Sequence, residues 1–244
     1  MISSNMYKFL DDLKWQVEAG IDEVISDSPI KSSEENVIKE NKKTENTLPI
    51  NLDNFKNCND LYKYFSNSIE CELKNISKNS IKIQGNLNSK IMIITNIPSS
   101  VEDMKGKVLV GKSYNLFINI LSSINLSLDH LCFTPIIPWK TPGERELNQS
   151  EIDLLLPFIR KQIDIIRPKI LIFLGADPIK YILQKNDGIL NLRGSFIDYT
   201  YSNTTISCLP ILAPDFLIRR PEYKRETWND LIILSKMIKK LNLQ

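Results

Sequence analysis

Hydrophobic residues are spaced differently in the first fifty residues and in the rest of the chain. Residues 1–25 carry apolar side chains at steps of three and four, from Tyr7 to Val24, and this pattern predicts an amphipathic helix. Residues 26–53 are polar and charged without a period. Such a segment buries too little apolar surface to offset its chain entropy, so we expect a flexible linker. The folded domain is expected over residues 54–244.

Short apolar runs and helical patterns alternate through that domain. Four runs predict buried strands, at residues 90–95, 131–137, 169–175 and 205–212. Apolar residues at helical spacing indicate helices near residues 55–65, 113–124, 148–166, 177–184 and 222–241. Asn148 and Glu151 match a capping box at the start of the third of these. The alternation predicts a three-layer α/β/α sandwich around a central, mostly parallel four-stranded sheet.

A parallel sheet of this kind binds ligands beyond the carboxyl ends of its strands. The loops that leave those ends are therefore the places to look for chemistry. They cover residues 95–112, 135–148, 175–178 and 212–221.

Composition adds few constraints on function. The formal net charge of +2 is too small to identify a nucleic-acid binder, so a local basic patch would be needed. The four cysteines contain no CxxC pair and are expected to be buried thiols in a reducing compartment. No apolar run approaches the roughly 20 residues of a membrane span, and the first residues do not have the order of a signal peptide. We expect a cytoplasmic monomer without membrane contact.

The loops contain motifs that, taken in order, resemble the family 4 uracil-DNA glycosylases. The resemblance covers residue 60 to the end of the chain. The matching residues include Pro98, Glu102, Asp103, Gly106 and Gly111 in the first loop, Pro142, Gly143 and Arg145 in the second, Pro168, Lys169, Leu174 and Gly175 around the third strand, and Pro214, Leu217, Arg219, Pro221, Lys224, Arg225, Trp228, Asp230 and Leu231 near the end.

This resemblance implies a DNA glycosylase of base excision repair that acts on a base flipped out of double-stranded DNA. Its base-pocket positions correspond to Asn96, Pro98, Leu109, Pro135 and Ala213. Four of them differ from the family, which has an acidic residue at 96, a stacking Phe at 109, a uracil-reading Asn at 135 and a His at 213. Loss of one donor to a developing anion costs about a hundredfold to a thousandfold in rate. We therefore expect uracil excision to be weak, altered or absent.

A second interpretation is a catalytically inactive module on the same fold. It would bind DNA or a protein partner, with residues 1–25 as the recruiting element. Retention of the acidic pair Glu102 and Asp103 favours an enzyme, because either carboxylate could orient a water or oppose positive charge on the sugar. The alternative for this pair is that it caps the following turn or faces solvent. Glu144 is expected to form an exposed ion pair with Arg145, and His130 to have no catalytic role.

The last loop and the start of the final helix are expected to contact DNA. Apolar side chains there could wedge into the base stack while basic ones meet phosphates. The alternative is a turn whose apolar residues pack inward. The predicted DNA-binding residues are Arg145, Phe216, Leu217, Ile218, Arg219, Arg220, Lys224 and Arg225.

Members of the resembled family often carry an iron–sulfur cluster on four cysteines. Only Cys71 falls at a matching position here, while Ser68, Trp139 and Leu155 occupy the other three. Because such a cluster needs four thiolates, we expect neither a cluster nor another metal or cofactor.

Overall fold

The computed structural model of the protein describes residues 52–185, 187–201 and 204–243. The predicted helix at 1–25 lies outside these residues, as does the predicted linker at 26–53 except for its last two positions. Both therefore remain predictions.

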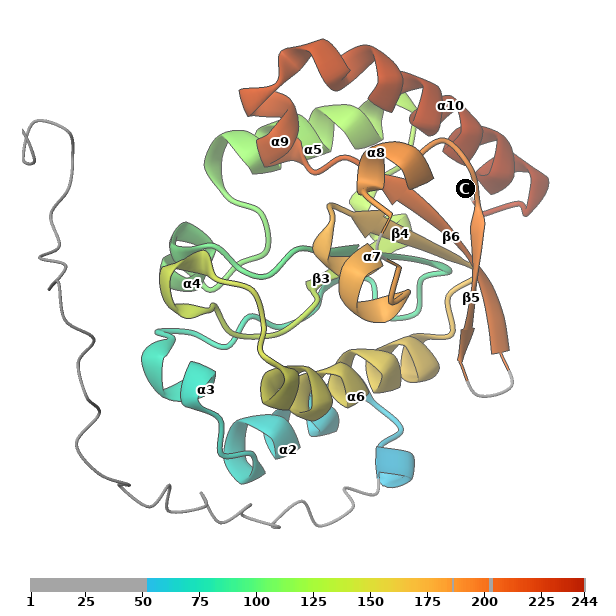
Figure 1. Ribbon diagram of the computed structural model, residues 1–244. Helices are drawn as coiled ribbons and strands as arrows, with labels where there is room; N and C mark the ends of the chain where they lie inside the picture. Colours follow the sequence, from blue (N-terminus) through green and yellow to red (C-terminus); the bar gives the residue numbers. More distant parts are fainter. Residues whose placement is uncertain (1–51, 186, 202–203, 244) are drawn as a thin grey trace, which may run out of the picture. The chain divides into compact units, whose positions relative to one another are not determined.

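Within the described residues the strands form one six-stranded sheet in the order β1-β3-β2-β4-β6-β5 (Figure 1). The four central strands are parallel: β2 (Ile91–Thr95), β3 (Leu131–Pro135), β4 (Ile170–Leu174) and β6 (Thr204–Ile211). They confirm the predicted parallel sheet. Two antiparallel edge strands, β1 (Gln84–Gly85) and β5 (Ile197–Tyr201), were not predicted.

Helices cover both faces of the sheet, and this completes the predicted three-layer sandwich. Figure 1 shows α5 and α10 on one face and α6 with α2 on the other. The helical segments are η1 (Leu52–Asn54), α2 (Cys58–Ser68), α3 (Glu72–Ile76), α4 (Ser100–Lys105), α5 (Gly111–Ser123), η2 (Leu128–His130), η3 (Pro142–Glu144), α6 (Gln149–Ile166), α7 (Asp177–Ile182), α8 (Ile189–Leu192), α9 (Pro214–Arg219), η4 (Pro221–Tyr223) and α10 (Lys224–Lys240). None of these helices is both long enough and apolar enough to cross a bilayer.

The core has two halves because successive side chains of a strand point to opposite faces. Ile91 and Ile93 of β2 belong to one buried cluster together with Phe117 of α5 and Leu231 of α10. On the other face the rings of α2 pack on Phe158 of α6. Their centroid distances to Phe158 are 4.9 Å for Tyr62 and 4.3 Å for Phe65. The continuous apolar runs of the sequence thus correspond to strands that are buried on both sides.

Two capping boxes fix where helices start. The predicted box at Asn148 and Glu151 is confirmed at the start of α6. A second box, formed by Ser99 and Glu102, starts α4 in what the sequence indicated only as a loop. Since α4 follows β2 directly, this second box holds the Glu102 carboxylate at the carboxyl edge of the sheet.

Candidate active site

A cavity of about 410 Å³ lies at the carboxyl ends of the parallel strands. This volume is within the usual range for small-molecule sites. Its walls come from the ends of β2 and β4 and from the segments that follow, which include α4, the start of α5, the turn at η3, the start of α7, and α9. The lining residues are Thr95, Asn96, Ile97, Pro98, Ser99, Val101, Glu102, Leu109, Val110, Ser113, Glu144, Arg145, Glu146, Leu174, Asp177, Ala213, Asp215 and Arg219.

Four of the five predicted base-pocket positions line this cavity, namely Asn96, Pro98, Leu109 and Ala213. Residues more than a hundred positions apart in the sequence, such as Asn96 and Ala213, therefore line the same cavity. Pro135 is buried at the end of β3, paired in register with Thr95, and is not part of the lining.

The carboxylate of Glu102 faces the cavity and is held by three donors. Its Oε2 accepts hydrogen bonds from the Ser99 backbone N–H at 2.8 Å and from the Ser99 hydroxyl at 2.7 Å. Its Oε1 accepts from the backbone N–H of Leu109 at 2.7 Å. Leu109 itself has a positive φ of 53°. Glu102 thus caps α4, as the alternative interpretation of the sequence had it, and also fixes the loop that carries Leu109 into the lining.

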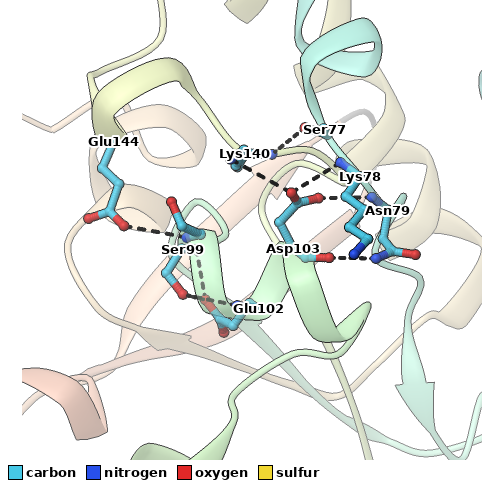
Figure 2. Close-up of polar contacts among 9 residues, drawn as sticks. Ser77, Lys78, Asn79, Ser99, Glu102, Asp103, Lys140 and Glu144 are labelled. Carbon is cyan, nitrogen blue, oxygen red and sulfur yellow. Dashed lines mark hydrogen bonds and ion pairs between the residues drawn. The ribbon is translucent and has the colours of Figure 1, made fainter.

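Asp103 is the next residue but does not line the cavity, and Figure 2 shows its side chain directed toward Lys78, Asn79 and Lys140. Its side chain is buried and accepts backbone hydrogen bonds from Lys78 at 3.0 Å and from Asn79 at 2.9 Å. The ammonium group of Lys140 lies 3.8 Å from Oδ2. These contacts join α4 to the segment after α3, so the geometry of Asp103 is that of a structural carboxylate.

Arg145 lines the cavity, but its partner differs from the one expected. Its guanidinium makes a two-pronged ion pair with Glu151, at 2.8 Å and 2.7 Å. The predicted ion pair between Glu144 and Arg145 is wrong. Glu144 instead accepts a hydrogen bond from the Ser100 backbone N–H at 3.4 Å. Residues 143 and 144 both have positive φ, which turns the two neighbouring side chains apart. The guanidinium of Arg145 holds the pKa of Glu151 below its usual range.

The predicted apolar wedge on α9 is divided between the interior and the surface. Leu217 is buried with 1% exposure and packs inward, whereas Ile218 is 39% exposed. The half-buried ring of Phe216 lies 5.3 Å from that of Tyr223, centroid to centroid. Only Ile218 therefore presents an exposed apolar side chain on this helix for contact with another molecule.

The basic residues predicted to contact DNA are exposed beside the wedge. Arg219 lies in the cavity lining and forms an ion pair with Asp215 at 3.0 Å, and Arg220 lies 3.7 Å from Glu222. Both pairs are largely solvated, and such pairs contribute little and exchange easily. Lys224 and Arg225 are exposed at the start of α10.

Asp177 is a lining carboxylate that sequence reasoning did not single out. Its backbone N–H donates to Asn96 Oδ1 at 3.1 Å, and its Oδ2 accepts from the backbone N–H of Ile97 at 2.9 Å. Burial raises its pKa above the ordinary value, while the Ile97 N–H acts in the opposite direction. The signal in the sequence that could have found it is its position, because Asp177 starts the segment that follows the carboxyl end of β4.

The cysteines do not provide a four-thiolate site. Cys58, Cys71, Cys132 and Cys208 are all buried and free, and no set of three or more His, Cys, Asp or Glu residues in the described part of the chain is arranged to hold a metal ion. Burial raises the pKa of the Cys58 and Cys132 thiols to about 11, which opposes the thiolate form that a cluster needs. The residues present therefore do not fit such a cluster.

Comparison with known proteins connects the chain to one family. The model of the "Uracil DNA glycosylase superfamily" matches residues 83–232. The type-4 uracil-DNA glycosylase of Saccharolobus solfataricus is 28% identical over 161 residues, covering 64% of this chain and 74% of that protein. The type-4 enzyme of Thermotoga maritima is 25% identical over 173 residues, covering 70% and 88%. A DNA polymerase of Bacillus phage SP01 is 26% identical over 167 residues, which cover 68% of this chain and 18% of the polymerase.

Proposed function

The chain belongs to the uracil DNA glycosylase superfamily, and from this membership we propose that it hydrolyses the N-glycosyl bond of a damaged base flipped out of double-stranded DNA. The observation that carries the proposal is the cavity of about 410 Å³ at the sheet edge. Its lining brings together Asn96, Glu102 and Ala213, which the sequence resemblance assigns to one pocket. A flipped base needs an enclosed site of this kind, because its ring and its edge must be held away from the duplex.

Excision of uracil by this pocket is proposed to be slow. Uracil leaves as an anion, and donors aimed at its developing charge normally supply a large part of the rate. Ala213 has no side-chain donor, and Leu109 offers an aliphatic surface instead of an aromatic ring for stacking. The side chain of Asn96 still has a donor, its NH2 group. The Oδ1 of the same amide accepts the Asp177 N–H, so the NH2 group is not used in that contact.

The DNA surface proposed for this activity surrounds the cavity mouth at α9. Ile218 is an exposed apolar side chain next to the exposed cations Arg219 and Arg220. An apolar wedge beside basic groups suits duplex DNA, since the wedge fills the space of the flipped base while the cations meet phosphates. Lys224 and Arg225 extend the same basic surface at the start of α10.

The test uses duplex oligonucleotides that carry a single uracil or hypoxanthine. Base release is measured by alkaline cleavage of the abasic product, and binding to undamaged duplex is measured by gel shift. Release above the level of a protein-free control supports the proposal, and Arg219→Ala together with Arg220→Ala should weaken binding with a reduced salt dependence. The variant Asp198→Asn, which alters an exposed carboxylate of edge strand β5 outside the cavity lining, is the matched control.

Binding of duplex without release of any base would favour the second candidate, an inactive DNA-binding module on the same fold. The observation that favours this candidate is Ala213, which lies in the lining without a donor. Failure of both assays would contradict both proposals.

A further inference from the structure

Two loops on the wall of the cavity are joined by a pair of hydrogen bonds, called the latch below. The loop after β2 and the loop after β4 exchange hydrogen bonds: the Asp177 N–H donates to Asn96 Oδ1 at 3.1 Å, and the Ile97 N–H donates to Asp177 Oδ2 at 2.9 Å. Gly175, with a φ of 116°, makes room for this exchange, because a Cβ there would overlap the Asn96 amide. The position of the Asp177 carboxylate is therefore set by backbone groups, as a preorganised site requires.

The second oxygen of this carboxylate remains available. In the described part of the chain no donor reaches Asp177 Oδ1, and Asp177 is part of the cavity lining. Glu102 differs in this respect, because both of its oxygens already accept hydrogen bonds within the α4 cap and from Leu109. Of these two lining carboxylates, Asp177 is thus the one with an oxygen to offer to a reacting group.

The surroundings of Asp177 suit a base more than a permanent anion. The charged groups that act on it are Lys180 from its own helix, Glu146 from the turn after η3 and Asp215 from α9. Lys180 forms an ion pair with Glu146 at 2.5 Å, so part of its charge is already engaged. Partial burial and the two neighbouring carboxylates raise the pKa of Asp177. A carboxylate with a raised pKa accepts a proton more readily than an exposed one.

We propose that Asp177 is a catalytic carboxylate of this pocket, whose Oδ1 receives the proton of the attacking water; this assignment rests on the proposed glycosylase function. The bond between C1′ of the deoxyribose and the base nitrogen breaks, and its electron pair leaves with the base. The oxygen of a water molecule forms a new bond to C1′, and one of its protons passes to Asp177. Asp177 then gives this proton back to solvent, and the released base takes one up from solvent, so that free base and an abasic sugar result and the carboxylate is restored. Before water adds, the negative charge of the same carboxylate stabilises the positive charge on the sugar.

The test compares Asp177→Asn with the wild-type protein and with Asp198→Asn. Asparagine keeps an oxygen for the Ile97 N–H, so the latch is retained while the base is lost. We expect kcat for the best oligonucleotide substrate to fall by about a hundredfold or more, with KM and duplex binding changed less than about threefold. In the wild-type protein kcat should rise with pH along a limb above the ordinary titration range of aspartate, and Asp177→Asn should lack that limb.

The variant Glu102→Gln distinguishes the two carboxylates. It should lower stability by weakening the α4 cap and should keep the pH limb. Wild-type kcat retained by folded Asp177→Asn, or a limb lost only in Glu102→Gln, would overturn the assignment of Asp177 and leave the glycosylase proposal standing. Absence of release by the wild-type protein on every duplex would refute the glycosylase proposal itself, and the assignment of Asp177 would fall with it.

Discussion

Replacement of Asp103 by Asn should destabilise the fold and leave the chemistry intact. The Asp103 side chain is buried with 2% exposure, and its two oxygens accept hydrogen bonds from the backbone N–H groups of Lys78 and Asn79 (Figure 2). The Asn79 side-chain amide also donates, to the backbone carbonyl of Asp103 at 2.6 Å. Three contacts, counting that of Lys140 at 3.8 Å, therefore depend on the Asp103 carboxylate.

The magnitude follows from what asparagine can replace. Its carbonyl oxygen can accept one of the two backbone N–H groups, but its NH2 group faces the other one. One hydrogen bond to a charged acceptor is lost, which costs about 1.5–3 kcal/mol, and a backbone donor is left without a partner, which brings the total to about 2–4 kcal/mol. Lys140 adds less, because its ammonium group lies 3.8 Å from the carboxylate, beyond hydrogen-bond distance. Asp103→Ala removes both acceptors and should cost about 3–5 kcal/mol.

Urea unfolding of Asp103→Asn, Asp103→Ala and the control Asp198→Asn measures these differences. Base release per folded molecule should stay within about threefold of wild type, because Asp103 does not line the cavity. If Asp103→Asn unfolds within about 0.5 kcal/mol of wild type and yet loses base release, Asp103 is catalytic and the structural interpretation is wrong.

Three further predictions concern the cavity wall and α9. Gly175→Ala places a Cβ against the Asn96 amide at a φ of 116°, so it should cost about 1–3 kcal/mol in thermal unfolding and reduce base release. Leu217→Ala should lower the free energy of unfolding by about 2–5 kcal/mol, whereas Ile218→Ala should change it by less than about 0.5 kcal/mol and weaken duplex binding in a gel shift. Burial raises the folded-state pKa of Asp177, so ionisation destabilises the fold as pH rises through that pKa. Asp177→Asn should therefore be more stable than wild type at pH 7 in urea unfolding, and this advantage should vanish below about pH 4.

The parts of the fold that could be predicted are those with strong local signals. Apolar runs marked β2, β3 and β4, because a strand buried on both faces has no polar side, whereas β6 begins with two exposed threonines. The edge strands β1 and β5 lack that signal, since β1 has two residues and β5 has only one fully buried position. The start of α4 carried a readable signal, the spacing of Ser99 and Glu102, but glycines and small residues around it favoured a loop.

The site was predictable to the level of its loops and not to the level of its contacts. Glu102 and Asp103 are adjacent on one helix, where successive side chains diverge by about 100°, so only one of them can face the cavity. The sequence does not say which one it is. The partner of Arg145 was equally hidden, because it depends on the backbone turn at residues 143 and 144. Leu217 and Ile218 raise the same difficulty, since both are apolar and only the packing of α9 assigns one to the core.

The charges around the cavity suggest which half of the proposed reaction the protein assists. Breaking an N-glycosyl bond creates positive charge on the sugar and negative charge on the base. Of the lining arginines, Arg145 is held by Glu151, Arg219 lies in an exposed pair with Asp215 and is proposed to meet phosphates, and Ala213 has no donor for the base. The remaining charged groups are carboxylates. Their negative charge stabilises the sugar cation and repels a base anion. On the proposed mechanism the departing base must therefore carry much of its own charge, so bases whose anions are intrinsically stable should be released in preference to uracil. The charged residues that line the cavity are Glu102, Glu144, Glu146, Asp177, Asp215, Arg145 and Arg219.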